Sequence, residues 1–297
     1  MTLVILYRGK CNLSKCITRY LVAMASADLM VIILDLILKH IPIVFYKTFE
    51  GFRDIGMCNI HAVLLYATTD CSVWFTVAFT FDRFVVICCQ KLKTKHCTER
   101  TAALVIGALT ALFCAKNTLW YFQFTGRYIF MRVPWLCVMK YSALFSPVWA
   151  AIEFLHYVLT PCIPFILILV FNALTVRHIL VTIRTRKRLR HQVTRERQND
   201  PEAKSRKQSI VLLFLISGNF LVLWSLFVVS SMHSRIILLE TTSDEEMSPI
   251  VKELGFMLQL LSCCTNTFVY AVTQRKFREE IKNGVKYPIT SLKWTMY

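Results

Sequence analysis

Long runs of apolar residues, separated by shorter polar stretches, recur along the whole chain. Each run is about as long as the roughly 20 residues that a helix needs to cross a bilayer, or longer. The pattern predicts membrane-spanning helices over Ile17–Leu38, Ile60–Cys88, Ala102–Phe124, Val148–Val181, Ile210–Met232 and Leu254–Val272. We therefore expect an all-α, polytopic membrane protein whose helices form a bundle.

A shorter apolar segment precedes these spans. Residues 1–7 (MTLVILY) would reach only about 10 Å as a helix, against a hydrocarbon core of about 30 Å. Basic residues follow the segment, whereas in a secretory signal peptide they come first. We interpret it as the remnant of a truncated first helix, which would complete a bundle of seven.

Basic residues gather in every second polar stretch. The net charge is +17, and 24 of the 35 Lys and Arg residues fall in segments 8–15, 90–100, 177–207 and 274–297, against 8 in the alternate loops. Because basic loops stay in the cytosol, this bias predicts a cytosolic C-terminus. Topology and anionic lipid explain the charge, so nucleic acid is not expected as a partner. We expect a multi-pass protein of the plasma membrane.

One domain without repeats or low-complexity tracts accounts for the chain. Past the last span, Phe277, Ile281 and Val285 recur at i, i+4 and i+8 with charges between them, which is typical of an amphipathic helix on the inner leaflet. The expected bounds are 1–285 for the transmembrane domain, with 184–207 as its third cytosolic loop and 274–285 as the membrane-surface helix, and 286–297 for a cytosolic tail.

Only two of the twelve cysteines, Cys58 and Cys137, fall on the predicted outer side. Two is the number that one disulfide needs, and the outer side is the oxidising one. A bridge would tie the loop after the third complete span to the start of the second. The alternative is a pair of free thiols. No cysteine spacing indicates a zinc site.

Charged residues inside the spans indicate where function lies, because a charge in lipid is costly. Asp28 lies mid-span in LVAMASADLMVIIL, and Asp82 with Arg83 ends the next span in FTFDRFVVICC. The pair at the cytosolic boundary is either a snorkelling interfacial pair or a latch that responds to protonation or to a partner. We find no nucleophile with its base, Gly-rich phosphate loop or HExxH pair, so an enzyme is not expected.

These charges belong to a larger set of motifs in a fixed order. The set is Asp28, Cys58 at 25 residues before Arg83, Asp82-Arg83-Phe84, Phe220 at four residues before Trp224, Asn266 to Tyr270 (NTFVY), and Phe277. Each motif is weak alone, but together they resemble the rhodopsin-like (class A) G-protein-coupled receptor family over the whole chain. Segments of the second, third and seventh helices are most similar to a subgroup of orphan-type receptors associated with aromatic amino acids.

The resemblance implies roles for the matched residues. Arg83 matches the arginine that meets the G protein, and Asp82 matches its resting partner. Trp224 matches the toggle beneath the ligand, with Phe220 one turn before it, and Tyr270 matches the tyrosine that turns inward on activation. The implied partners are a heterotrimeric G protein on the cytosolic face, a small extracellular ligand and membrane lipid.

The resemblance also implies an allosteric sodium ion, the one cofactor expected. Asp28, Ser72, Ser262 and Asn266 match positions that hold this ion in the inactive state. A lone carboxylate in lipid is costly unless a cation or hydrogen-bond donors offset it, which gives the site a physical basis. The alternative is an Asp28 that is protonated or bonded to Asn266.

Three positions depart from the family pattern. Leu226 and Thr267 stand where the family usually has prolines, so two helix kinks are lost. Arg206 stands where many members carry an acid, and it would repel Arg83. These departures favour a second interpretation, a non-signalling or truncated receptor-like decoy. A transporter is a remote alternative, because no inverted repeat is evident.

A receptor of this shape would bind its ligand between the outer halves of the third, fifth, sixth and seventh helices. Counting from the motifs places these residues at the pocket: Leu65, Tyr66, Thr69, Glu153, His156, Tyr157, Phe227, Ser231, Lys252, Phe256 and Gln259. Leu65 stands where a monoamine receptor would need an aspartate. The aromatic wall, with Glu153 and Lys252 as opposite charges, favours a small aromatic ligand that has an amine and a carboxylate, such as an aromatic amino acid. The alternative is that Glu153 and Lys252 face lipid headgroups.

Overall fold

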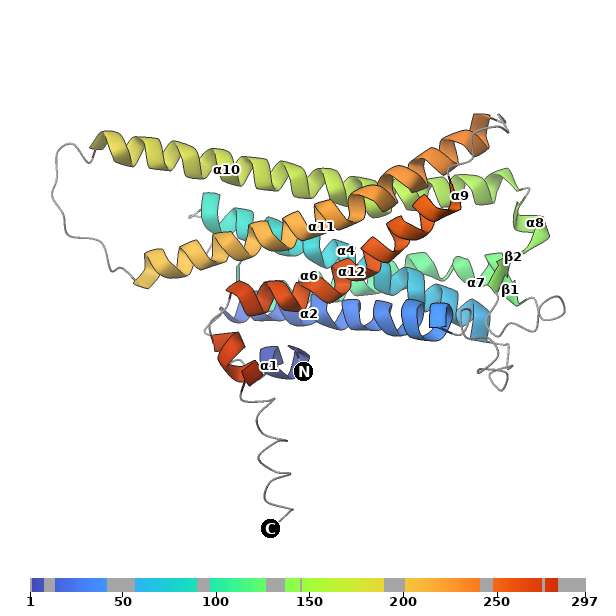
Figure 1. The fold of residues 1–297 in the computed structure, drawn as a ribbon, viewed down its shortest axis with the longest axis horizontal. Helices are drawn as coiled ribbons and strands as arrows, with labels where there is room; N and C mark the ends of the chain where they lie inside the picture. The colour runs from blue at the N-terminus through green and yellow to red at the C-terminus, as the bar shows by residue number, and fades with distance from the viewer. Residues whose placement is uncertain are drawn as a thin grey trace, which may run out of the picture.

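Helices make up nearly all of the described chain, and the long ones lie side by side as a bundle (Figure 1). The computed structural model describes residues 2–7, 14–41, 57–89, 97–126, 137–144, 146–189, 201–240, 248–273 and 276–282. Its elements are α1 (Thr2–Tyr7), α2 (Lys15–Val31), η1 (Ile32–His40), α4 (Met57–Cys88), α6 (Glu99–Asn117), α7 (Trp120–Gln123), β1 (Phe124–Gly126), β2 (Cys137–Met139), α8 (Tyr141–Leu144), α9 (Pro147–Tyr157), η2 (Val158–Cys162), α10 (Ile163–Leu189), α11 (Pro201–Glu240) and α12 (Pro249–Thr273).

The predicted helical membrane fold is confirmed. The helices long and apolar enough to cross a membrane are Lys15–His40, Cys58–Cys88, Glu99–Gln123, Pro147–Thr185, Ile210–His233 and Ile250–Thr273. They coincide with the six predicted spans. The apolar pattern did not predict one small feature, the antiparallel ribbon of β1 and β2, in which Phe124 lies opposite Met139 and Gly126 opposite Cys137. Strands of three residues are too short to show a period of two.

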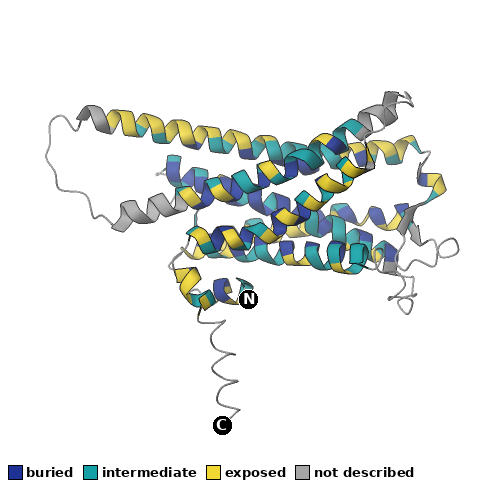
Figure 2. Cartoon of the chain, viewed as in Figure 1, coloured by how far each residue is buried: buried dark blue, intermediate teal, exposed yellow. Residues whose placement is uncertain are grey.

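Helix α4 forms the centre of the bundle and packs against α2, α6 and α10. In its most apolar stretch 67% of the residues are buried, against 17% in the Glu99–Gln123 span and 22% in the Pro147–Thr185 span. Exposed residues lie mainly on the outer faces of the peripheral helices (Figure 2). Large apolar side chains are exposed there, among them Leu104, Val222 and Phe268. In an aqueous protein such a surface would be costly, whereas in a bilayer it contacts lipid.

Two spans contain a π-helical segment, and each segment reaches the outer half of the bundle. In η2, Pro161 lacks the N–H that a helix needs, and its ring disfavours a helical Thr160, whose φ and ψ are −146° and 93°. In η1, nine residues of the second span form a wider turn. By contrast, Leu226 and Thr267 lie inside the uninterrupted helices α11 and α12. Neither helix is interrupted at these positions, as the loss of the two prolines predicts.

A short helix over residues 276–282 follows the last span. Phe277 is fully buried, and its ring centroid lies 6.1 Å from that of Tyr270 at an interplanar angle of 85°. Ile281 packs against the same core. The apolar side of this helix therefore packs against the bundle. Its contact with the inner leaflet stays a prediction. Val285 lies outside the described residues.

Candidate functional site

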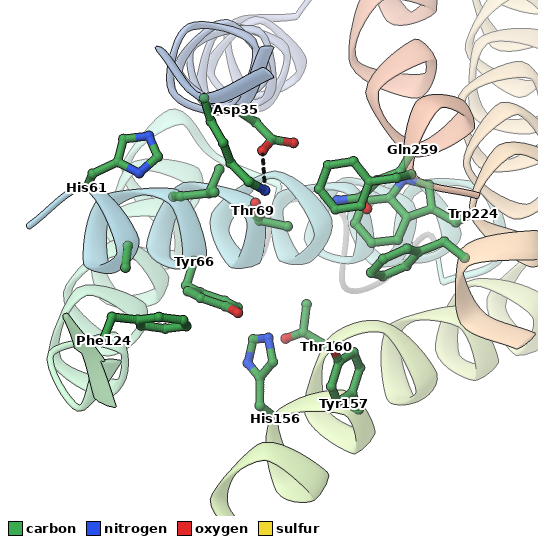
Figure 3. Close-up of a pocket in the computed structure, with 15 residues that line it drawn as sticks. Asp35, His61, Tyr66, Thr69, Phe124, His156, Tyr157, Thr160, Trp224 and Gln259 are labelled. Carbon is green, nitrogen blue, oxygen red and sulfur yellow. Dashed lines mark hydrogen bonds and ion pairs between the residues drawn. The ribbon is translucent and has the colours of Figure 1, made fainter. Parts of the chain in front are cut away.

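A cavity of about 250 Å³ opens between η1, the N-terminal half of α4, α9 with η2, α11 and α12 (Figure 3). Its lining residues are Asp35, Lys39, His61, Ala62, Leu65, Tyr66, Thr69, Phe124, His156, Tyr157, Thr160, Trp224, Phe227, Phe256 and Gln259. Eight of the predicted pocket residues are among them, and they come from four helices far apart in the sequence. Residues of η1 line the cavity as well, and the sequence-based hypothesis did not include this segment.

Three predicted pocket residues, Glu153, Ser231 and Lys252, do not line this cavity. Glu153 is buried and accepts a hydrogen bond from the side-chain amide of Gln123 at the end of α7, so it faces the fourth span. Counting from motifs assumes a straight helix of fixed rotation, whereas Thr160, just after α9, departs from helical geometry. The hypothesis that Glu153 and Lys252 are the charged anchors of the pocket is therefore wrong for this cavity.

The charged part of the lining comes from η1 instead. Lys39 Nζ lies 3.1 Å from Asp35 Oδ1 and 4.7 Å from the centroid of the Phe256 ring. Asp35 is 2% exposed, and its carbonyl oxygen lies 3.0 Å from His40 Nδ1. Sequence reasoning missed this pair, although an acid and a base four residues apart in an apolar run were a usable signal.

Aromatic rings form the opposite wall. Tyr66 stacks on Trp120 with ring centroids 4.5 Å apart, and the His156 ring lies perpendicular to both, with centroids 5.2 Å away. Figure 3 shows Tyr66 of α4 and His156 of α9 pointing toward one another. Such a wall suits a flat apolar group, because ring faces and edges attract each other at these distances.

A buried polar cluster behind this wall orients His156. Lys116 Nζ lies 3.0 Å from His156 Nδ1 and 2.7 Å from Asp70 Oδ2, and Asn117 Nδ2 donates to the same Asp70 oxygen at 2.6 Å. An ammonium only donates hydrogen bonds, so His156 Nδ1 accepts, and the neutral ring carries its hydrogen on Nε2. The cluster therefore makes His156 a hydrogen-bond donor through Nε2.

Two polar atoms of the lining lack a hydrogen-bond partner within the described part of the chain. They are Thr160 Oγ1 and Gln259 Oε1, whose residues are 4% and 5% exposed. Thr160 faces the cavity because Pro161 breaks the helix beside it. Figure 3 shows Thr160 and Gln259 at the edge of the cavity. A buried polar atom without a partner costs about 1 to 3 kcal/mol. A polar ligand could offset that cost.

Trp224 lies at the inner end of the lining and connects it to the core. Its ring centroid lies 5.1 Å from Phe220 and 5.7 Å from Phe227. Trp224 and Phe220 are 3% and 4% exposed and belong to one apolar cluster with Ile168 of α10. The residues predicted as the toggle are therefore in contact, and they are placed to sense what fills the cavity.

Deeper in the bundle, Asp28 joins four helices through hydrogen bonds. Ser72 Oγ donates to its Oδ1 at 2.5 Å, and Asn266 Nδ2 donates to its Oδ2 at 2.8 Å. Asn219 of α11, which the sequence analysis did not single out, donates from Nδ2 to Asn266 at 3.5 Å. Ser262, the fourth predicted residue, is buried, and its carbonyl oxygen accepts from Asn219.

Asp82 and Arg83 form a buried contact near the C-terminal end of α4. Arg83 Nε donates to Asp82 Oδ2 at 3.0 Å, and Cys16 of α2 donates its thiol hydrogen to Asp82 Oδ1 at 3.3 Å. Tyr270 is buried nearby in the core, and its hydroxyl has no partner among the residues that the structure describes. The side chain of Arg206 lies outside the described residues, so its predicted repulsion of Arg83 stays a prediction.

Cys58, at the outer end of α4, is disulfide-bonded. Cys137 lies on β2, whose backbone pairs with β1 beside the cavity, but its side chain is outside the described set. The pairing of these two cysteines stays a prediction.

Comparison with known proteins identifies the relatives of the chain. A family model described as "7 transmembrane receptor (rhodopsin family)" matches residues 1–270. The chain is 24% identical to compound eye opsin BCRH2 of Hemigrapsus sanguineus over 82% of the chain and 65% of that opsin. It is 23% identical to melatonin receptor type 1A-A of Danio rerio over 94% of the chain and 74% of that receptor. The chain thus spans just under two thirds of the length of the opsin.

Proposed function

The chain belongs to the rhodopsin family of seven-transmembrane receptors, and we propose that it binds a small extracellular ligand and activates a heterotrimeric G protein. Membership of a receptor family bears out the prediction that the chain is not an enzyme, and it sets the transporter alternative aside. The observation that carries the proposal is the outer cavity, in which Trp224 forms part of the lining and contacts Phe220 of the core. We further propose that the protein resides in the plasma membrane with its C-terminus in the cytosol.

The ligand that we propose is a small aromatic molecule with an amine and a carboxylate, such as an aromatic amino acid. The lining rings of Tyr66 and His156, with Trp120 stacked on Tyr66, support an aromatic group, and the unpartnered atoms of Thr160 and Gln259 support polar ends. The likeness of three segments to probable G-protein coupled receptor 139 and its sister receptor 142 supports the same class.

Signalling would follow from a shift in population between two states of the bundle. A ligand that packs against Trp224 favours one arrangement of α11 over the other, in proportion to its difference in affinity for the two. Outward movement of the inner end of α11 would free Arg83 from Asp82 and expose it to a helix of the G protein. The buried contact of Asp82 with Arg83 supports the resting half of this scheme.

We also propose that a sodium ion binds at Asp28 in the resting state. Hard cations prefer oxygen ligands, and the carboxylate of Asp28 and the hydroxyl of Ser72 supply them in one buried cluster. Asn266 turns its amide nitrogen to Asp28, and its amide oxygen accepts from Asn219. A sodium ion at Asp28 would supply the positive charge that a buried carboxylate needs. The alternative, an Asp28 that is bonded to Asn266 and holds no ion, is supported too, because Asp28 already accepts a hydrogen bond from Asn266.

A non-signalling decoy is the second candidate function. The observation that favours it is the uninterrupted course of α11 through Leu226 and of α12 through Thr267. A proline at either position would supply a hinge, because it removes one hydrogen bond from the ladder. A decoy would bind the ligand but leave the G protein inactive.

A second-messenger assay separates the two candidates. Cells that carry the chain are exposed to phenylalanine and tryptophan, beside cells that carry Arg83→Ala at the same surface level. A receptor responds, and the response disappears in Arg83→Ala although radiolabelled amino acid still binds. Binding without any signal in either chain would favour the decoy. Neither binding nor signal at normal surface expression would contradict the proposed ligand class.

A further inference from the structure

We infer that Asp35 and Lys39 are the charged anchors of the ligand, and that they bind the ammonium and the carboxylate of a zwitterion. The inference rests on the proposed function and assigns the charged end of its pocket. Both side chains line the cavity and form one ion pair, with 3.1 Å between Lys39 Nζ and Asp35 Oδ1. An acid and a base side by side match the two charged groups of an α-amino acid.

Charge balance favours a zwitterion over a simple cation or anion. Among the described residues, the lining contains one acid, Asp35, and one base, Lys39, so their formal charges cancel. His156 Nδ1 faces the ammonium of Lys116, so that contact suits a neutral ring, and His61 Nε2 donates to the carbonyl oxygen of Leu34 at 2.7 Å. A ligand with one charge would leave a buried charge unbalanced, which is strongly unfavourable. A zwitterion has no net charge, so the summed formal charge of the lining and the ligand stays zero.

The two residues of the pair differ in exposure. Asp35 is 2% exposed and lies 3.6 Å from His40 Nδ1, so its carboxylate is held in place. The Lys39 side chain is 35% exposed and carries its charge on a flexible stem. The ligand ammonium therefore takes the place of Lys39 Nζ at Asp35, and Lys39 turns to the ligand carboxylate. Each charge keeps a partner throughout this exchange.

A second contact for the ammonium is available on α12. Gln259 Oε1 lines the same cavity and has no partner among the described residues. An ammonium carries three hydrogens, so it can donate to Asp35 and to Gln259 together. Phe256 lies one turn before Gln259, and its ring already faces a cation, Lys39 Nζ, at 4.7 Å. The aromatic group of the ligand then lies toward Tyr66 and His156.

The test compares the zwitterion with two analogues, each of which keeps only one of its charged groups. Cells carrying the full chain are given phenylalanine, phenethylamine, which lacks the carboxylate, or 3-phenylpropionate, which lacks the ammonium. The chain is compared with Asp35→Asn and Lys39→Met, and with Lys252→Met as the matched control, because Lys252 does not line the cavity. Potency in the second-messenger assay and in binding is measured at equal surface expression.

We expect phenylalanine to be at least about tenfold more potent than either fragment, the gain typical of one charge-assisted hydrogen bond. Asp35→Asn should lower the potency of phenylalanine about tenfold or more and leave that of phenylpropionate unchanged or raised, because Lys39 is then free to bind an anion. Lys39→Met should lower the potency of phenylalanine equally and leave that of phenethylamine unchanged or raised, because Asp35 is then free to bind a cation. Lys252→Met should leave all three potencies unchanged.

A variant that keeps the ion pair guards against misfolding. Asp35→Lys combined with Lys39→Asp retains an acid and a base four residues apart, so it should reach the surface yet bind phenylalanine at least about tenfold more weakly. Phenylalanine potency that survives this exchange or both single changes, or falls in Lys252→Met instead, would overturn the inference and leave the proposed function standing. A surface-expressed wild-type chain that neither binds nor responds to phenylalanine and tryptophan would overturn both.

Discussion

If Asp28 is ionised, its hydrogen bonds from Ser72 and Asn266 offset the buried charge only in part. If a sodium ion completes the site, the ion binds the folded state and stabilises it by mass action. We expect the purified chain to melt a few degrees higher in sodium chloride than in choline chloride of equal strength. Asp28→Asn should abolish the difference, whereas Glu253→Gln, an exposed change on α12, should keep it. Equal melting of the wild-type chain in both salts would favour a protonated or purely hydrogen-bonded Asp28.

Lys116 pairs with Asp70, a further buried carboxylate behind the wall of the pocket. Asp70 is 0% exposed and receives hydrogen bonds from Lys116 and Asn117. Lys116→Met would leave that charge buried without its cation, and we expect a loss of about 3 to 5 kcal/mol of stability, measured as thermal unfolding of the purified chain. Adding Asp70→Asn should recover part of the loss, because no buried charge remains. Independent, additive losses in the double variant would show that the pair is not coupled.

At the scale of helices, the close approach of α11 and α12 depends on one glycine. A Cβ on Gly255 would lie 3.2 Å from the Cα and the N of Phe227, which is backbone and cannot turn away. We expect Gly255→Ala to separate the two helices slightly and to cost about 1 to 3 kcal/mol, the range typical of overpacking.

Gly218 offers the matched control for this change. It lies in the same helix as Phe227, and a Cβ there would meet nothing within 4 Å. Gly218→Ala should therefore leave the melting temperature unchanged or raise it, because alanine favours a helix by up to about 1 kcal/mol over glycine. Equal melting temperatures of the two variants would contradict the close contact. Weaker ligand binding in Gly255→Ala would in addition link this contact to the pocket, since Phe227 lines it.

Helices also differ in where they bend, and the bends decide the pocket. Prolines predict bends well: Pro161 ends regular geometry at Thr160, while Leu226 and Thr267 lie within unbroken helices. The π-helical turn of η1 has no such marker, since no proline lies in IILDLILKH. The position of this turn was therefore not predictable from the motifs, although the spacing of Asp35 and Lys39 was a usable signal for the pair itself.

For the whole molecule, the distribution of basic residues predicts a cytosolic C-terminus. The structure contains no membrane, so this orientation is tested in cells. An epitope tag after Tyr297 should be stained only after the plasma membrane is permeabilised, whereas a tag within segment 241–247 should be stained on intact cells. Staining of the C-terminal tag on intact cells would contradict the proposed orientation and, with it, the assignment of Arg83 to the cytosolic side.

The sequence alone determined the number and position of the six spans, because backbone groups in lipid must be satisfied within each helix and only long apolar runs allow this. It also indicated which residues of the inner bundle would meet: Asp28 contacts Ser72 and Asn266, and Asp82 contacts Arg83. Fixed motif positions on regular helices make such contacts predictable.

Only the tertiary structure decided which charges face the cavity. Glu153 and Lys252 were the predicted anchors, and Asp35 and Lys39 line the cavity instead. The position of a residue along a span follows from sequence, but the rotation of its side chain depends on tilt, π-helical turns and packing against other helices. Tilt, π-helical turns and packing depend on contacts between segments far apart in the chain, so they cannot be predicted from a single apolar run.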